Sequence, residues 1–149
     1  MTRLLALLAL LVVAAMGISW LTRPRASARD TERVFRVGQE WRFIGRPGDP
    51  KPTLVIVRVD TLSRIGEVIH VSVRGVRVLN AHAPAGYVEA VPHLPFTPAA
   101  LERSVTTLAA DSVKLPDFEA GYEEWRRAQG GAFSVSVREA LDLAEQAIK

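Results

Sequence analysis

The feature that most constrains the fold is a change in the spacing of apolar residues near Thr97. Before it, short segments rich in β-branched residues are separated by turn-forming residues. Residues 53–59 (TLVIVRV) are apolar on both faces, which is typical of a central strand. Residues 67–75 (EVIHVSVRG) alternate apolar and polar side chains, as in a strand with one buried face. The alternation shifts by one residue at Gly75, which predicts a bulge or a tight turn there.

After Thr97 the apolar residues follow the period of a helix. Thr97 is a suitable N-cap, and Pro98 suits the first helical position. Ser136 and Glu139 form the sequence pattern of a capping box, which indicates where a last helix begins. The pattern as a whole predicts helices from 97 to about 109, from about 117 to just before 130, and over 137–148.

Two shorter segments complete the expected fold. Residues 40–44 (EWRFI) carry strand-favouring aromatic side chains, and residues 132–135 (AFSV) are typical of a short edge strand. Strand signals followed by helix signals predict the α+β class, with an antiparallel sheet of about four strands followed by two or three helices packed on one face. Residues 34–149 are numerous enough to bury a core of their own, so we expect one domain there.

The N-terminal segment indicates export. Residues 4–21 contain no charged side chain, and as a helix they would be about 27 Å long, close to the thickness of a bilayer's hydrocarbon core. We interpret residues 1–22 as a signal peptide or an N-terminal membrane anchor, and residues 23–33 as a flexible linker. Either interpretation places the domain in the periplasm or on the periplasmic face of the inner membrane. An inverted anchor with a cytoplasmic domain is the alternative.

The net charge of +3 belongs to the first thirty residues, which hold four arginines and one aspartate. The remaining residues carry 15 basic and 15 acidic side chains, because 19 − 4 = 15 and 16 − 1 = 15. A neutral domain lacks the basic surface that nucleic-acid binding needs, so we expect no nucleic-acid partner. The absence of cysteine excludes a disulfide framework, a thiolate metal site and a cysteine nucleophile.

Residues 79–96 (LNAHAPAGYVEAVPHLPF) hold two of the three histidines and three of the nine prolines. Imidazole and carboxylate groups bind divalent metals, so His82, Glu89 and His93 are a candidate metal site, with His70 as a further candidate. Their spacing matches no ligand motif such as H-E-x-x-H. A proline-stiffened loop whose histidines bond backbone carbonyls explains the segment equally well, and a general acid or base is a third interpretation.

Phe118, Tyr122 and Trp125 are spaced i, i+4 and i+7, which places them on one face of a helix. Such a stripe is typical of a core. It would also serve as an aromatic wall for an apolar ligand or a partner, with Gly121 allowing another backbone to come close.

The sequence contains no G-x-S-x-G elbow, Walker loop, G-x-G-x-x-G loop, zincin helix or EF-hand loop. Catalysis therefore has no signature here, although a Ser–His–Asp site leaves no fixed spacing and stays open. We expect no cofactor, and we favour a protein that is not an enzyme.

The stretches VGQEWRF…RPGD, HAPAGYVEAVPHLPF and LPDFEAGYEEWRRA together resemble a group of small uncharacterised bacterial envelope or secreted proteins. The resemblance covers most of the chain after the export segment. It implies one compact domain, and it carries over no activity and no catalytic residues.

These observations predict a non-catalytic, envelope-located binding or interaction module whose ligand is a protein partner. The alternatives are a metal- or histidine-dependent hydrolase using the 82–93 loop, and a small-ligand carrier with a pocket between sheet and helices. The expected contact surface is the 82–96 loop with the exposed part of the 118–125 helix. Its candidate residues are His82, Tyr87, Glu89, His93, Phe96, Tyr122 and Trp125.

Overall fold

The structure is a computed structural model that describes residues 33–148. The predicted signal peptide or anchor at 1–22 lies outside the described residues, and so does the linker except for Arg33. Within residues 33–148, no helix has the length and the apolar character needed to cross a membrane.

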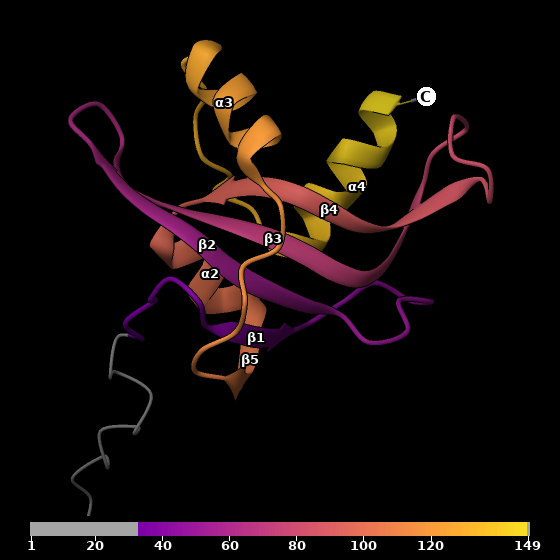
Figure 1. The fold of residues 1–149 in the computed structure, drawn as a ribbon, viewed down its shortest axis with the longest axis horizontal. Helices are drawn as coiled ribbons and strands as arrows, with labels where there is room; N and C mark the ends of the chain where they lie inside the picture. Colours follow the sequence, from indigo (N-terminus) through magenta and orange to yellow (C-terminus); the bar gives the residue numbers. More distant parts are fainter. Residues whose placement is uncertain (1–32, 149) are drawn as a thin grey trace, which may run out of the picture. The chain divides into compact units, whose positions relative to one another are not determined.

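The described residues form a five-stranded antiparallel sheet and three helices, which confirms the α+β class (Figure 1). The order of the strands in the sheet is β4-β3-β2-β1-β5. The sheet has one strand more than the approximately four that were expected. Its strands are β1 (Glu40–Phe43), β2 (Thr53–Leu62), β3 (Gly66–Leu79), β4 (Tyr87–Phe96) and β5 (Val105–Ala110).

Gly75 marks an irregularity inside β3, as the shift in alternation predicted. The pairing of β3 with β4 changes register between Arg74 and Val78. Gly75 has a φ of +69°, and a Cβ placed on it would collide with the carbonyl oxygen of Lys51. Only glycine combines this backbone conformation with so close an approach of the backbone at Lys51.

Most of the segment expected to be a loop at 82–96 is a strand: residues 87–96 form β4, an edge strand of the sheet, and residues 82–86 lie in the turn before it. Pro92 and Pro95 lie within β4, and a proline is tolerated in an edge strand because its missing N–H need not face a neighbouring strand. Residues 132–135 do not form a strand. They contribute one isolated parallel bridge between Phe133 and Phe96, in which the Phe133 N–H donates to the carbonyl oxygen of Pro95 at 2.9 Å.

The helices are α2 (Pro98–Ser104), α3 (Glu119–Arg127) and α4 (Val137–Ile148). The Thr97 side chain caps α2 by accepting from the Ala100 N–H at 3.3 Å, as expected. The capping box at α4 is also present, since the Ser136 N–H donates to the Glu139 carboxylate at 2.9 Å. The first helix was expected to reach about residue 109, but it ends at Ser104. The β-branched residues of VTTLAA continue as β5, in contact with β1.

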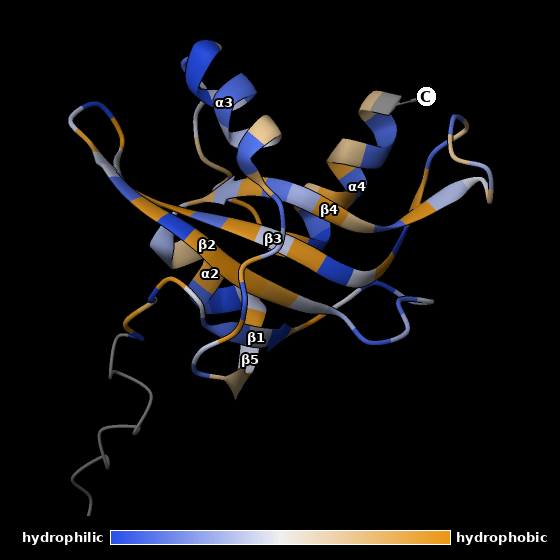
Figure 2. Ribbon diagram, viewed as in Figure 1, coloured by the Kyte–Doolittle hydropathy of each residue, from blue (hydrophilic) through white to orange (hydrophobic). Residues whose placement is uncertain are grey.

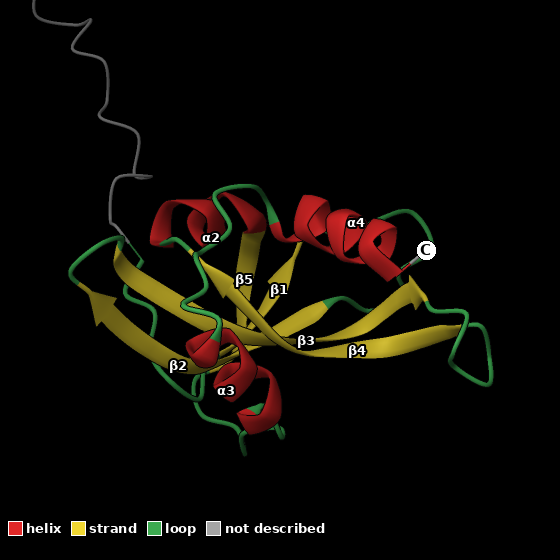
Figure 3. Cartoon of the chain, turned by 90° about the horizontal axis from the view of Figure 1, so that it is seen from above, coloured by secondary structure: helices red, strands yellow, loops and turns green. Residues whose placement is uncertain are grey.

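Helices cover both faces of the sheet, so the expectation that they pack on one face was wrong for α3. Figure 3 shows α2 and α4 on one side of the strands and α3 on the other. The side chains of β2 alternate accordingly: Leu54 and Ile56 belong to the core under α2 and α4, whereas Val55 and Val57 contact α3. This explains why the first half of β2 is apolar on both faces, which is visible as an orange stretch of that strand in Figure 2.

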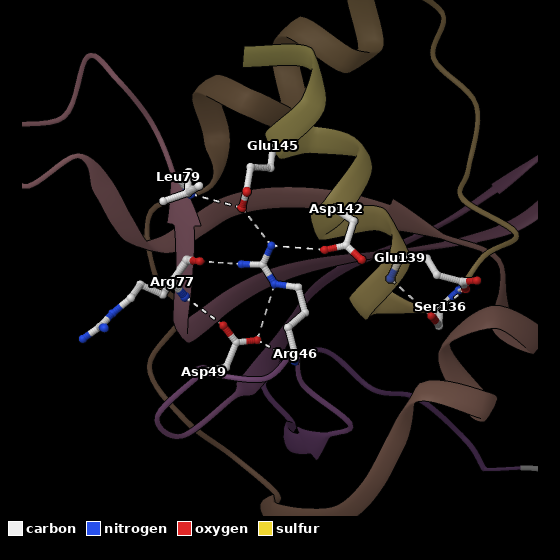
Figure 4. A network of polar contacts seen from close by, with 8 residues as sticks. All are labelled: Arg46, Asp49, Arg77, Leu79, Ser136, Glu139, Asp142 and Glu145. Carbon is white, nitrogen blue, oxygen red and sulfur yellow. Dashed lines mark hydrogen bonds and ion pairs between the residues drawn. The ribbon is translucent and has the colours of Figure 1, made fainter. Parts of the chain in front are cut away.

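A polar network joins α4 to the sheet and to the β1–β2 loop (Figure 4). The Arg46 side chain is only 10% exposed, and its Nη1 lies 2.9 Å from Glu145 and 3.3 Å from Asp142. Another of its nitrogens donates to the carbonyl oxygen of Arg77, and its Nε lies 3.6 Å from Asp49. A buried guanidinium needs such partners, because desolvation of an unpaired charge is costly. This network therefore fixes the position of α4.

Candidate functional site

The aromatic stripe of α3 faces the sheet, and most of it is core. Phe118 and Tyr122 are 8% and 7% exposed and pack against Val55 and Val57 of β2. Trp125 is half-buried at the edge of this cluster. The core interpretation is therefore correct for the first two aromatic residues, and only Trp125 remains accessible for binding.

A partly buried polar cluster lies beside the stripe. His70 of β3 is fully buried, and its Nδ1 lies 2.9 Å from Nε2 of His93 on β4. Its Nε2 lies 3.3 Å from Asp60 Oδ2, although the geometry is not that of a hydrogen bond. Asp60 accepts hydrogen bonds from the Tyr122 hydroxyl and from Arg58 Nε, both at 2.9 Å. We call Asp60, His70 and His93 the histidine cluster.

The neighbours of His70 determine which ring nitrogen carries its proton. A carboxylate beside Nε2 favours the tautomer with an N–H at that position. Nδ1 of His70 then accepts, and Nε2 of His93 donates to it. This assignment leaves Nδ1 of His93 as an acceptor, on the side of the ring that faces Gly121.

The pKa values agree with a neutral pair of imidazoles next to a charged carboxylate. Burial, together with the neighbouring His93 ring, lowers the pKa of His70 from 6.5 to about 4. Burial also lowers the pKa of His93. Burial raises the pKa of Asp60, but hydrogen bonds from Tyr122 and Arg58 outweigh it and hold that pKa below its usual value. At neutral pH both imidazoles are therefore uncharged and Asp60 is ionised.

The three residues of the candidate metal site do not come together. His82 is exposed in the turn after Asn80, where its backbone N–H donates to the Asn80 side chain at 2.9 Å. Glu89 is exposed on β4, four residues from His93, which corresponds to about 13 Å along a strand. In the part of the chain that the structure describes, no group of three or more histidine, aspartate and glutamate side chains is arranged to hold a metal ion.

The remaining candidate residues are divided between separate regions. Phe96 is fully buried in the core under α2 and α4, so it is not part of a contact surface. Tyr87 is half-buried at the start of β4, with the Arg77 guanidinium 4.8 Å from its ring centroid. His93, Tyr122 and Trp125 are the candidates that the fold brings together: the ring centroids of His93 and Tyr122 are 6.0 Å apart and those of Tyr122 and Trp125 are 5.7 Å apart.

Sequence reasoning missed Arg58 and Asp60. Both lie in the second half of β2, where VRVDTL interrupts an apolar strand with charges. Arg58 pairs in register with His70 across β2 and β3, and its guanidinium lies 4.6 Å from the Tyr122 ring centroid. The sequence signal for this site was an acidic residue, Asp60, within a largely apolar strand.

Trp125 forms a wall between two surface hollows. Its indole N–H donates to the carbonyl oxygen of Gly131 at 2.8 Å, and its ring meets His70 edge to face at 4.5 Å. Any Cβ at Gly130 would collide with the indole. The first hollow, of about 440 Å³, is the apolar hollow, lined by Pro95, Trp125, Gly131, Ala132 and Phe133. The second, of about 490 Å³, is the arginine hollow, lined by Leu62, Ser63, Arg64, Trp125, Arg126, Gln129 and Gly130.

Comparisons with protein-family models, curated proteins and solved structures gave no match to this chain. The resemblance to small bacterial envelope proteins stays a prediction.

Proposed function

We propose that this protein is a non-catalytic binding module of the cell envelope, which holds a protein partner through an apolar side chain inserted into the apolar hollow. The observation that carries the proposal is a half-buried tryptophan, fixed in position, that forms one wall of a hollow also lined by Pro95, Ala132 and Phe133.

The hollow has the properties of an anchoring site for a partner. Tryptophan is enriched among the residues that contribute most to protein–protein binding, and it contributes most when it lines a pocket. The bond to Gly131 and the contact with His70 hold the Trp125 ring before any partner arrives. Binding then costs little side-chain entropy, which favours affinity.

The envelope location rests on the sequence. The uncharged run at 4–21 with Arg3 before it is the pattern of an export signal or an anchor. A partner in the periplasm or at the periplasmic face of the inner membrane follows from that interpretation.

Binding is favoured over histidine chemistry for a geometric reason. Both ring nitrogens of His70 face protein groups, so this imidazole is not available to a substrate. The hollow of about 230 Å³ beside His93 is lined by Pro92, Asp117, Phe118, Ala120 and Gly121, and none of these supplies a hydroxyl nucleophile.

The test is a native pull-down with the full-length chain tagged at its C-terminus and extracted mildly from the envelope. Gly131→Leu fills the apolar hollow, and a Cβ at this position meets nothing within 4 Å. Ala85→Leu adds the same side chain in the exposed turn before β4 and is the matched control.

The proposal expects a stoichiometric partner that the wild type and Ala85→Leu retain and Gly131→Leu loses. Thermal unfolding of both variants should match the wild type. A partner that Gly131→Leu retains in full, or no partner with any of the three proteins, would contradict the proposal.

A further inference from the structure

We propose that the partner segment carries a carboxylate next to its apolar anchor, with the apolar side chain in the apolar hollow and the carboxylate in the arginine hollow. This inference rests on the proposed function and names the chemistry of the partner. It assigns the binding of an acidic, apolar peptide segment to the surface on both sides of Trp125.

The two hollows are close enough for one short segment to occupy both. Trp125 lines each of them, and the adjacent residues Gly130 and Gly131 line one hollow each. Consecutive Cα atoms are about 3.8 Å apart, so the hollows meet along a single peptide unit. In an extended peptide, side chains on one face recur at every second residue, about every 7 Å, so residues two apart can reach both hollows.

The charge of the arginine hollow favours a carboxylate. Arg64 and Arg126 line it, and its lining within the described residues includes no acidic side chain. Arg64 lies in the exposed β2–β3 turn and donates one hydrogen bond to the carbonyl oxygen of Gln129 at 3.1 Å. A guanidinium has five N–H donors in a planar fork, so Arg64 keeps further donors for a bidentate contact with a carboxylate.

Arg126 is also available to a partner. It contacts Glu123 one turn earlier on α3 at 2.6 Å, and its side chain is 64% exposed. An exposed ion pair within a helix holds its two side chains only weakly, and salt screens it. A carboxylate that approaches Arg64 and Arg126 together would compete successfully for Arg126.

A peptide fits this surface better than a lipid does. An anionic phospholipid also combines apolar and anionic groups, but its acyl chain would need a long apolar channel. The apolar hollow is bounded by five residues and holds about 440 Å³, which suits one or two side chains.

The test uses the full-length protein in detergent and two blocked pentapeptides as probes. One has the sequence Gly-Phe-Glu-Glu-Gly, and in the other both glutamates are glutamines. The readout is the indole N–H resonance of Trp125, assigned with a Trp125→Phe variant. The acidic peptide should reach half-saturation at a concentration about three- to fivefold lower than the glutamine peptide, as expected for exposed ion pairs.

Arg64→Gln combined with Arg126→Gln should remove this preference, and so should about 0.5 M NaCl, where the Debye length falls below about 5 Å. Equal binding of both peptides would overturn the inference while leaving the proposed function intact, provided that Gly131→Leu still loses its captured partner. A larger shift with anionic phospholipid vesicles than with the acidic peptide would overturn it in favour of a lipid ligand. If neither peptide shifts the resonance, the inference is also wrong.

Discussion

On the face of the sheet that α2 and α4 cover, the central core is apolar, and the buried charges of Arg46 and Asp49 lie in the network that joins α4 to the β1–β2 loop. The face that α3 covers buries His70 and Tyr122, with Asp60 partly buried, beside a much smaller apolar cluster. On the first face, burial of apolar area stabilises the fold largely independently of pH. On the second, part of the stability depends on the protonation of a few groups.

This difference separates the part of the molecule that carries most of the stability from the part that carries the proposed binding site. The apolar core under α2 and α4 holds the sheet together, whereas the histidine cluster supports the Trp125 ring that separates the two hollows. Changes on the first face should therefore affect stability most. Changes on the second should be smaller and should depend on pH.

The largest effect is expected from Phe96→Ala, which removes a fully buried ring under α2 and α4. We expect it to lower the free energy of unfolding by about 4 kcal/mol, through lost transfer energy and a cavity. The matched change on the other face, Phe118→Ala, should cost roughly 1 kcal/mol less, because this ring packs into a much smaller apolar cluster. Urea denaturation measures both.

A larger cost for Phe118→Ala than for Phe96→Ala would reverse the comparison between the faces. If Phe96→Ala does not fold, Phe96→Leu and Phe118→Leu keep the comparison measurable, since volume-conserving changes are tolerated better.

The next effect is a loss of stability in acid that originates on the α3 face. Burial holds the pKa of His70 at about 4 in the fold, against 6.5 for an ordinary histidine. Between these values the unfolded chain binds a proton that the folded protein excludes. The contribution of the neutral His70 is therefore complete above about pH 6.5 and is lost as the pH falls towards 4, by up to about 3 kcal/mol.

Denaturation curves between pH 4 and pH 7 measure this loss, and His70→Asn should flatten the dependence. His82→Gln is the control, because His82 is exposed in the turn after Asn80. The assignment fails if His70→Asn and the wild type lose stability in parallel, or if His82→Gln flattens the curve equally.

Tyr122→Phe should have a smaller effect. It removes the hydroxyl that donates to Asp60 at 2.9 Å and leaves the ring against Val55 and Val57. A hydrogen bond to a charged group contributes about 1.5–3 kcal/mol, and we expect the lower end because Arg58 still pairs with Asp60. The pKa of Asp60 should rise towards its usual value, which carboxyl NMR titration measures. An unchanged Asp60 pKa would show that the hydroxyl does not hold the charge.

The parts of the fold that local chemistry determines could be predicted from the sequence. The cap at Thr97, the capping box at Ser136 and the irregularity at Gly75 each depend on residues next to one another in the chain. The strands β4 and β5 could not be predicted in this way. The prolines of β4 are tolerated because it lies at the edge of the sheet, and VTTLAA is a strand because β1 lies beside it.

The grouping of the site residues depends on tertiary structure even more than the strands β4 and β5 do. His82, Glu89 and His93 were grouped because they are close in sequence, but β4 keeps Glu89 and His93 about 13 Å apart. The actual partner of His93 is His70, 23 residues away on the neighbouring strand. The pairing of β2 with β3 brings Asp60 beside His70. Strand pairing creates these contacts, and no local spacing in the sequence indicates them.

The smallest expected effect concerns the first face. It tests whether the polar contacts that cap α4 contribute little to stability there. Ser136→Ala removes the hydroxyl that contacts the Glu139 carboxylate at 2.7 Å and accepts from its N–H at 3.3 Å, at the start of α4. An N-cap change of this kind costs about 1 kcal/mol, whereas Ser136→Gly should cost only a few tenths of that. Because Val137, Ala140 and Leu141 remain buried and Arg46 still pairs with Asp142 and Glu145, α4 should stay in place. Urea denaturation at pH 7 and pH 5 should give the same cost at both values. A cost that differs between them would mean that the α4 face shares the acid dependence assigned here to the histidine cluster.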